Sequence, residues 1–159
     1  MQVRKASEED ADKACQVIDR SFTALCHSDH HDDARTISLW RANRTAEKMR
    51  RWIDEHHVFV AVEDGSIVGV GGITASGEII LSYVSPDARF RGISKALAAR
   101  LEATASDLAV KTITLQSSAT AHQFYISRGY KDDGPSTKGY GRTFCYPMAK
   151  RLIYAAPSG

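Results

Sequence analysis

Three basic side chains crowd the predicted start of a helix in the stretch VSPDARFRGISKAL, which begins at Val84. They are Arg89, Arg91 and Lys95. A helix N-terminus carries a partial positive charge, so cations are unfavourable there unless an anion binds beside them. The free amides of the first turn would hold a phosphate, and Gly92 would let the backbone approach it closely. The stretch therefore predicts a diphosphate site between a strand that ends at Val84 and a helix that begins near Gly92.

A solvated basic loop that Gly92 merely helps to turn is an equally good interpretation of the charges alone. The generic phosphate-binding motifs do not decide between the two. The pattern GxxxxGK[ST] is absent, and Gly69, Gly71 and Gly72 lie inside a strand pattern with no helix after it. Those three glycines favour a bulge, or close packing of another element against the strand.

The chain before this stretch begins with helix patterns. A short strand is expected over 2–6, and apolar residues at helical spacing predict a helix over about 8–25. The polar, aperiodic run 26–38 predicts a loop or a short helical turn. Thr45 can cap a second helix that ends near His56.

From His57 the pattern changes to strands joined by tight turns. Asp64-Gly65 between two apolar runs is a strong hairpin signal, and Gly129 is typical of the residue after a helix C-terminus. The expected elements are strands over 57–64, 66–74, 78–84 and 111–118, a helix from about Gly92 to Leu108, a helix over 120–129, and a last strand within 142–152 in which Pro147 indicates an edge or a bulge.

The element order β-α-α-β-β-β-α-β-α-β indicates a mixed α/β (α+β) fold in one domain. Its antiparallel middle excludes a regular doubly wound sheet, and 159 residues without repeats or a linker favour a single domain. The net charge of +2, from 21 basic and 19 acidic side chains, provides no overall field for nucleic acid or for an anionic membrane. Three scattered cysteines, no apolar leader and no run of roughly 18 apolar residues predict a cytoplasmic protein.

Two motifs resemble those of the GCN5-related N-acetyltransferase (GNAT) family. RFRGIS matches the pattern [Q/R]-x-x-G-x-[G/A], with Arg89 and Gly92 in place and Ser94 where Gly or Ala is usual. AHQFYISRGY is similar to A-x-x-F-Y-x-x-x-G-[FY], and Ser118 stands before it where many members have Asn. The two occur in the family's order, each at a predicted strand-to-helix junction. The resemblance implies a central mixed, mostly antiparallel sheet flanked by helices.

The activity that the resemblance implies is transfer of acetyl from acetyl-CoA to a primary amine of a small molecule or peptide. The amine attacks the thioester directly, a backbone N–H near Tyr83 and Val84 polarises the carbonyl, and Tyr125 donates a proton to the departing sulfur. The cofactor-binding residues implied in the same way are Tyr83, Val84, Arg89, Phe90, Arg91, Gly92, Ile93, Ser94, Lys95, Ala96 and Ser118. The domain would span 1–154, followed by a tail over 155–159, and pairing into a homodimer is common in the family.

Several alternatives stay open at this point. Tyr125 could be an amphipathic helical residue beside a buried Phe124, and the chain could be a non-catalytic acyl-CoA-binding or regulatory module. The base for the amine could be Glu78, His56 or His57, or the proton could leave through water.

The resemblance also implies that the segment CHSDHHDD, between the first two helices, borders the acceptor pocket. Asp32 and Asp33 would attract a cationic amine there, and Trp40 and Arg44 could line the same cleft, whereas Trp52 is better explained as a core residue. The histidines and aspartates of this segment lack a spacing typical of metal ligands, so no metal is expected. These residues do not name the acceptor.

Overall fold

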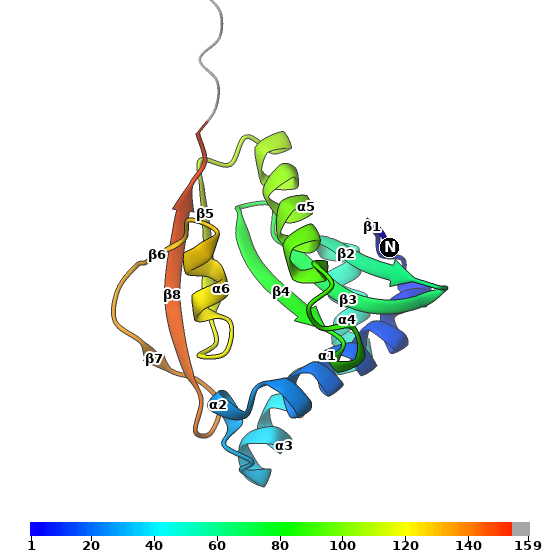
Figure 1. Ribbon diagram of the computed structural model, residues 1–159, viewed down its shortest axis with the longest axis vertical. Coiled ribbons are helices and arrows are strands. Elements are labelled where there is room, and N and C mark those ends of the chain that lie inside the picture. The colour runs from blue at the N-terminus through cyan, green and yellow to red at the C-terminus, as the bar shows by residue number, and fades with distance from the viewer. Residues whose placement is uncertain (154–159) are drawn as a thin grey trace, which may run out of the picture.

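The computed structural model describes residues 1–153, and the tail expected over 155–159 lies outside them. The strands are β1 Gln2–Lys5, β2 His57–Glu63, β3 Ser66–Ile73, β4 Glu78–Val84, β5 Thr112–Ser117, β6 Lys131–Asp132, β7 Thr137–Lys138 and β8 Phe144–Arg151. They form one sheet in the order β1-β2-β3-β4-β5-β8-β6, with β7 also paired to β8 (Figure 1). Only β4 and β5 are parallel among these pairs. The mixed, mostly antiparallel sheet expected from the sequence is confirmed.

Helices cover both faces of this sheet (Figure 1). They are α1 Ala11–Leu25, α2 His27–His30, α3 Ala34–Ala42, α4 Ala46–Glu55, α5 Ile93–Asp107 and α6 His122–Ser127, with 3-10 turns η1 Glu8–Asp10 and η2 Pro86–Ala88. One core joins α1 and α4 to the sheet through residues such as Ile18, Met49 and Val60. The other joins α5 to the opposite face through Leu97 and Phe59. Successive strand residues point to opposite faces, so the sheet separates two cores.

Helix α5 packs directly on the backbone of β3. A Cβ added at Gly69 would lie 2.7 Å from Cγ2 of Ile93 and 2.9 Å from Cδ1 of Leu97, so a larger residue would force α5 side chains to shift. The register of β3 against β4 also shifts between Gly72 and Ile73. The expectation of close packing and a bulge at these glycines is confirmed, and a dinucleotide loop is not formed there.

Strand β4 pairs with β5 only through its N-terminal end, which lies against the middle of β5. The register joins Glu78 to Thr114 and Ile79 to Leu115, and no further pair between them exists in the described part of the chain. Beyond Ile79 the two strands separate (Figure 1). One edge of β4, up to Val84, is therefore left without a strand partner.

The structure adds short elements that the sequence pattern did not predict. Helix α3 begins inside the run expected to be a loop, because Asp33 caps it by accepting a 3.0 Å hydrogen bond from the amide of Thr36. The two-residue strands β6 and β7 have no periodicity to detect. Strand β8 is not an edge strand: it pairs with β5 along its length, and the carbonyl of Pro147 accepts from the amide of Asp133 at 2.8 Å on the other side. Within residues 1–153 no helix has the length and apolarity that crossing a membrane needs.

Candidate active site

A cleft of about 920 Å³ opens where β4 and β5 separate. One side of it is formed by the start of α5 and the segment before it, and this part is called the α5 side. The other side is formed by the C-terminal end of α1, by α2 and α3, and by the β7–β8 hairpin, and is called the α3 side. The Tyr83 side chain packs with the core on the α1 and α4 face, whereas the neighbouring Val84 packs with the α5 core. The gap between the strands thus connects the two faces of the sheet.

On the α5 side, the first backbone amides of helix α5 have no hydrogen-bond acceptor within the helix. Gly92 precedes the helix in the left-handed conformation (φ 77°), no side chain caps the turn, and no acidic residue lies in it. The first intrahelical bond runs from the amide of Ala96 to the carbonyl of Gly92 at 3.0 Å. The amides of Ile93, Ser94 and Lys95 therefore point out of the helix end and can bind an anion.

The basic residues of this segment are not equivalent. Arg89 and Lys95 line the cleft, and the Arg89 guanidinium lies 4.7 Å from the ring centroid of Phe90. Phe90 itself is 93% exposed. Arg91 lies outside the cleft lining and forms an ion pair with Glu63 at the end of β2. Only two of the three cations predicted to bind the diphosphate therefore face the cleft.

The remaining sequence-predicted residues divide in the same way. The cleft lining includes Tyr83, Val84, Phe90, Gly92, Ile93, Ser94, Ser118 and Tyr125. Ala96 lies one turn into the helix, outside the lining, with its amide already bonded to Gly92.

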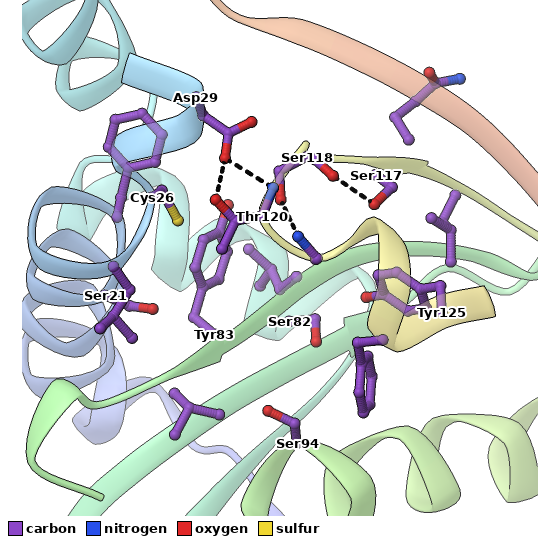
Figure 2. Close-up of a pocket in the computed structure, with 18 of the residues that line it drawn as sticks. Ser21, Cys26, Asp29, Ser82, Tyr83, Ser94, Ser117, Ser118, Thr120 and Tyr125 are labelled. Atoms are coloured by element: carbon purple, nitrogen blue, oxygen red, sulfur yellow. Dashed lines mark hydrogen bonds between the residues drawn. The ribbon is translucent and has the colours of Figure 1, made fainter. Parts of the chain in front are cut away.

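Tyr125 is buried in the wall of the cleft, on α6. Only 4% of the residue is exposed, and its ring meets Tyr130 edge-on with centroids 5.3 Å apart. Figure 2 shows its ring directed across the cleft toward β4, where Ser82 lies. Burial raises the pKa of Tyr125 to about 12, although hydrogen bonding with Ser82 opposes the shift. The hydroxyl therefore keeps its proton throughout the neutral range.

The free edge of β4 directs backbone amides into the cleft. The amide of Ser85 donates to the carbonyl of Val68 on β3 at 2.8 Å. Because backbone groups alternate in direction along an extended strand, the amides of Val84 and Ser82 face away from β3, toward the separated β5. The cleft thus contains fixed N–H donors on β4, the strand toward which Tyr125 is directed (Figure 2).

A buried carboxylate fixes the loop between β5 and α6. Asp29 on α2, only 3% exposed, accepts from the amide of Ala119 at 2.7 Å and from the amide and hydroxyl of Thr120 at 3.2 and 2.6 Å (Figure 2). The Ser118 hydroxyl accepts from the amide of Ala121 at 3.1 Å, at the start of α6. These bonds position the helix that carries Tyr125. Asp29 has no distinctive spacing in the sequence, so its role in holding this loop could not be predicted.

The α3 side is lined by aromatic residues around one cation. Trp40 and Arg44 line the cleft as expected, Tyr140 from the β7–β8 hairpin joins them, and Trp52 packs against the core. Burial raises the pKa of Tyr83, and the positive charge of Arg44 opposes that shift.

The residues expected to attract the amine or to act as its base do not line the cleft. Asp32 and Asp33 lie outside the lining, and so do Glu78, His56 and His57. Asp29 is the only acidic residue among the described residues that line the cleft, and no histidine lines it.

Three potential metal-ligand atoms lie within 4.8 Å of one another on His27, His30 and Asp32. Both ring nitrogens of His30 are already engaged, because Nε2 bonds to the carbonyl of Thr23 at 3.1 Å and Nδ1 accepts from the amide of Asp32 at 2.9 Å. His27 Nδ1 bonds to Asp32 Oδ1 at 2.9 Å. The cluster is a hydrogen-bonded turn, and His30 has no lone pair left for a metal.

Comparison with known proteins identifies the fold. The acetyltransferase (GNAT) domain model matches residues 27–152, whereas no curated protein matches the sequence. A GCN5-related N-acetyltransferase from Rhodopseudomonas palustris has a TM-score of 0.86 at 22% identity, over 95% of both chains. PaiA N-acetyltransferase from Thermoplasma acidophilum, in complex with coenzyme A, has a TM-score of 0.80 at 20% identity, over 95% of this chain and 98% of its own. An aminoglycoside 6'-N-acetyltransferase complexed with coenzyme A has a TM-score of 0.74 at 17% identity, over 98% and 99%.

Proposed function

The chain belongs to the GNAT family of N-acetyltransferases, and from this premise we propose that it transfers acetyl from acetyl-CoA to a primary amine of a small molecule or peptide. The observation that carries the proposal is the cleft at the separation of β4 and β5, which joins an anion-binding helix start to a buried tyrosine. Similar folds are solved with coenzyme A, which supports acetyl-CoA as the donor.

The diphosphate of the cofactor binds at the start of α5. The amides of Ile93, Ser94 and Lys95 lack intrahelical acceptors, and the side chains of Arg89 and Lys95 face the same cleft. Amide donors and charged side chains together give short, strong bonds to phosphate oxygens. The pantetheine arm then lies along the free edge of β4 and pairs with its backbone as an added strand does. Arg91, which is paired with Glu63, takes no part in this binding.

The thioester carbonyl accepts a hydrogen bond from the amide of Val84. This amide faces the cleft, and its position is fixed because β4 is bonded along its other edge to β3. When the amine nitrogen adds to the carbonyl carbon, negative charge develops on the oxygen. A donor that is already in place stabilises that charge without reorganisation.

Collapse of the intermediate breaks the carbon–sulfur bond, and Tyr125 donates its proton to the sulfur. The amide product keeps the new carbon–nitrogen bond, and the proton lost from the nitrogen replaces the one that Tyr125 gave. With a pKa of about 12, Tyr125 is a proton donor at every pH at which the enzyme works. Ser82 lies on β4 across the cleft from Tyr125, where it can orient the Tyr125 hydroxyl (Figure 2).

The acceptor enters as a neutral amine. Within residues 1–153 the only acidic group in the cleft wall is Asp29, whose oxygens already accept three hydrogen bonds, and the wall contains no histidine. Deprotonation therefore takes place in water before binding, and Glu78, His56 and His57 are not used. The proposed compartment is the cytoplasm, and a homodimer stays a prediction.

A thiol-release screen with acetyl-CoA tests the function. Purified protein is offered polyamines, amino acids, aminoglycosides and peptides, and free coenzyme A is measured with a thiol reagent. Acceptor-dependent release with formation of the acetylated amine supports the proposal. Acetyl-CoA binding with no release for any amine would instead support the non-catalytic alternative.

A further inference from the structure

Arg44 lies on the α3 side of the cleft with its guanidinium held among aromatic rings. Its Cζ is 4.9 Å from the ring centroid of Trp40 and 5.8 Å from that of Tyr140. Phe22 stacks on Trp40, with centroids 4.0 Å apart and planes within 5° of parallel, so the tryptophan is fixed. Trp40 also meets the ring of Tyr83 edge-on, with centroids 6.1 Å apart. Cation–π contacts engage the face of a guanidinium and leave N–H donors at its edge for another partner.

This guanidinium has no anionic partner among the described residues. Its Nε is buried without a hydrogen bond, and no ion pair in this part of the chain includes Arg44. Nearby arginines differ: Arg41 pairs with Asp19 at 2.6 Å, and Arg50 pairs with Asp12 at 3.3 Å. A donor removed from water without an acceptor costs free energy, so an anion bound in the cleft would stabilise Arg44.

The charges around Arg44 favour an anionic ligand. Asp29 lies in the same wall, but its carboxylate is occupied by three donors of the β5–α6 loop. Lys138 at the exposed rim adds a second positive charge on this side. A polycationic acceptor would meet like charges here. The acidic attraction expected from Asp32 and Asp33 is absent, because neither residue lines the cleft.

We propose that the acceptor is a small amine that carries a carboxylate, and that Arg44 binds this carboxylate. The inference rests on the proposed acetyl transfer and assigns its substrate class. A planar carboxylate accepts two parallel hydrogen bonds from a guanidinium. The Trp40 ring under Arg44 meets the ring of Tyr83 edge-on with centroids 6.1 Å apart, and Tyr83 precedes Val84 on β4, so a ligand held at Arg44 presents its amine toward the proposed thioester position.

Matched acceptors test this specificity. L-amino acids and the corresponding L-amino acid amides are compared at saturating acetyl-CoA, with kcat/KM expressed per neutral amine, because the carboxylate also raises the pKa of the neighbouring α-amine. For the pairs that react, we expect kcat/KM at least tenfold higher for the acid, because a site built for a polar group rejects the analogue that lacks it. Arg44→Gln should bring this ratio close to one and leave the KM for acetyl-CoA unchanged. Arg44→Lys should give an intermediate ratio, and the surface control Arg41→Gln should not change it.

A binding measurement that needs no turnover separates this inference from the proposed function. In Trp52→Phe protein Trp40 is the only tryptophan, so its fluorescence reports on the site beside Arg44. We expect a saturable change with benzoate, little with its neutral analogue benzamide, and none with benzoate after Arg44→Gln. This response without turnover of any amine would reject acetyl transfer and retain the anion site. The inference would be overturned if acids and amides were turned over equally. It would also be overturned if benzoate gave no fluorescence change, if the change persisted after Arg44→Gln, or if benzamide gave the same change.

Discussion

The two sides of the cleft are built in different ways. The α5 side comes from one continuous segment, Val84 to Lys95, and uses backbone amides with two cations at its edge. The α3 side is assembled from residues far apart in the chain, such as Phe22, Trp40 and Tyr140, and surrounds a single guanidinium with aromatic rings. A common cofactor can be held by a local motif, whereas a particular acceptor requires side chains that only the tertiary fold brings together.

The pH dependence of the reaction gives the largest effect, because the α3 side supplies no base. We expect kcat/KM for the acceptor to rise about tenfold per pH unit up to the pKa of the amine itself. Up to about pH 10, no decrease in kcat/KM should follow this rise, because the pKa of Tyr125 is raised to about 12 and the hydroxyl keeps its proton. The same raised pKa stabilises the fold below the ordinary tyrosine value of about 10, and this contribution is lost as the pH rises from there toward 12.

Initial rates with one acceptor from pH 6 to pH 10 provide the measurement. A plateau of kcat/KM near pH 7, well below the amine's own pKa, would mean that a side chain of the cleft acts as a base. The claim that the α3 side supplies no base would then be wrong.

Replacement of Asp29 by Asn should weaken the link between the α3 side and the β5–α6 loop, which leads into the helix of Tyr125. Its carboxylate accepts three hydrogen bonds from the β5–α6 loop, and bonds to a charged group contribute about 1.5–3 kcal/mol each in favourable cases. We expect the free energy of unfolding in urea to fall by about 2–3 kcal/mol. Asp32→Asn is the control: its side chain is 76% exposed, and its loss should change stability by less than about 0.5 kcal/mol. Equal effects of the two changes would contradict the role assigned to Asp29.

Replacement of Tyr125 by Phe removes only the proposed proton donor. We expect kcat to fall at least tenfold, about 1.4 kcal/mol in the barrier, with the KM for acetyl-CoA unchanged. Tyr130→Phe is a matched control, since Tyr130 is equally buried and its ring centroid is 5.3 Å away. Its hydroxyl is 3.5 Å from Glu102, so this change should affect stability and leave kcat intact. Full activity of Tyr125→Phe would remove this residue from the mechanism.

Two glycines with the same backbone conformation test the α5 side more finely. Gly92 and Gly65 have φ of 77° and 76°, and an added Cβ would meet nothing within 4 Å at either position. Alanine should therefore cost about 1–2 kcal/mol of stability at both. Only Gly92→Ala should also raise the KM for acetyl-CoA several-fold, because it shifts the first amides of α5. An equal rise with Gly65→Ala, in the β2–β3 turn, would assign the effect to stability alone.

The sequence predicted the α5 side well because its signals are local. The Gly92 turn, the helix after it and the strand to Val84 each follow from neighbouring residues, and the family motifs cover the same segment. Pairing of Arg91 with Glu63 could not be predicted, since the two residues are 28 positions apart. The role of Asp29 on the α3 side could not be predicted either. Its hydrogen-bond donors are 90 and 91 positions away, so nothing near it in the chain distinguishes it from Asp32.

Titration calorimetry with acetyl-CoA tests the central claim most directly. The unmodified protein should bind one equivalent. Arg89→Gln, which removes a cation facing the cleft, should weaken binding about three- to tenfold. Arg91→Gln should change it by less than about twofold, because that guanidinium is paired with Glu63 outside the cleft. No binding to the unmodified protein, or a larger loss with Arg91→Gln than with Arg89→Gln, would contradict a diphosphate site at the start of α5.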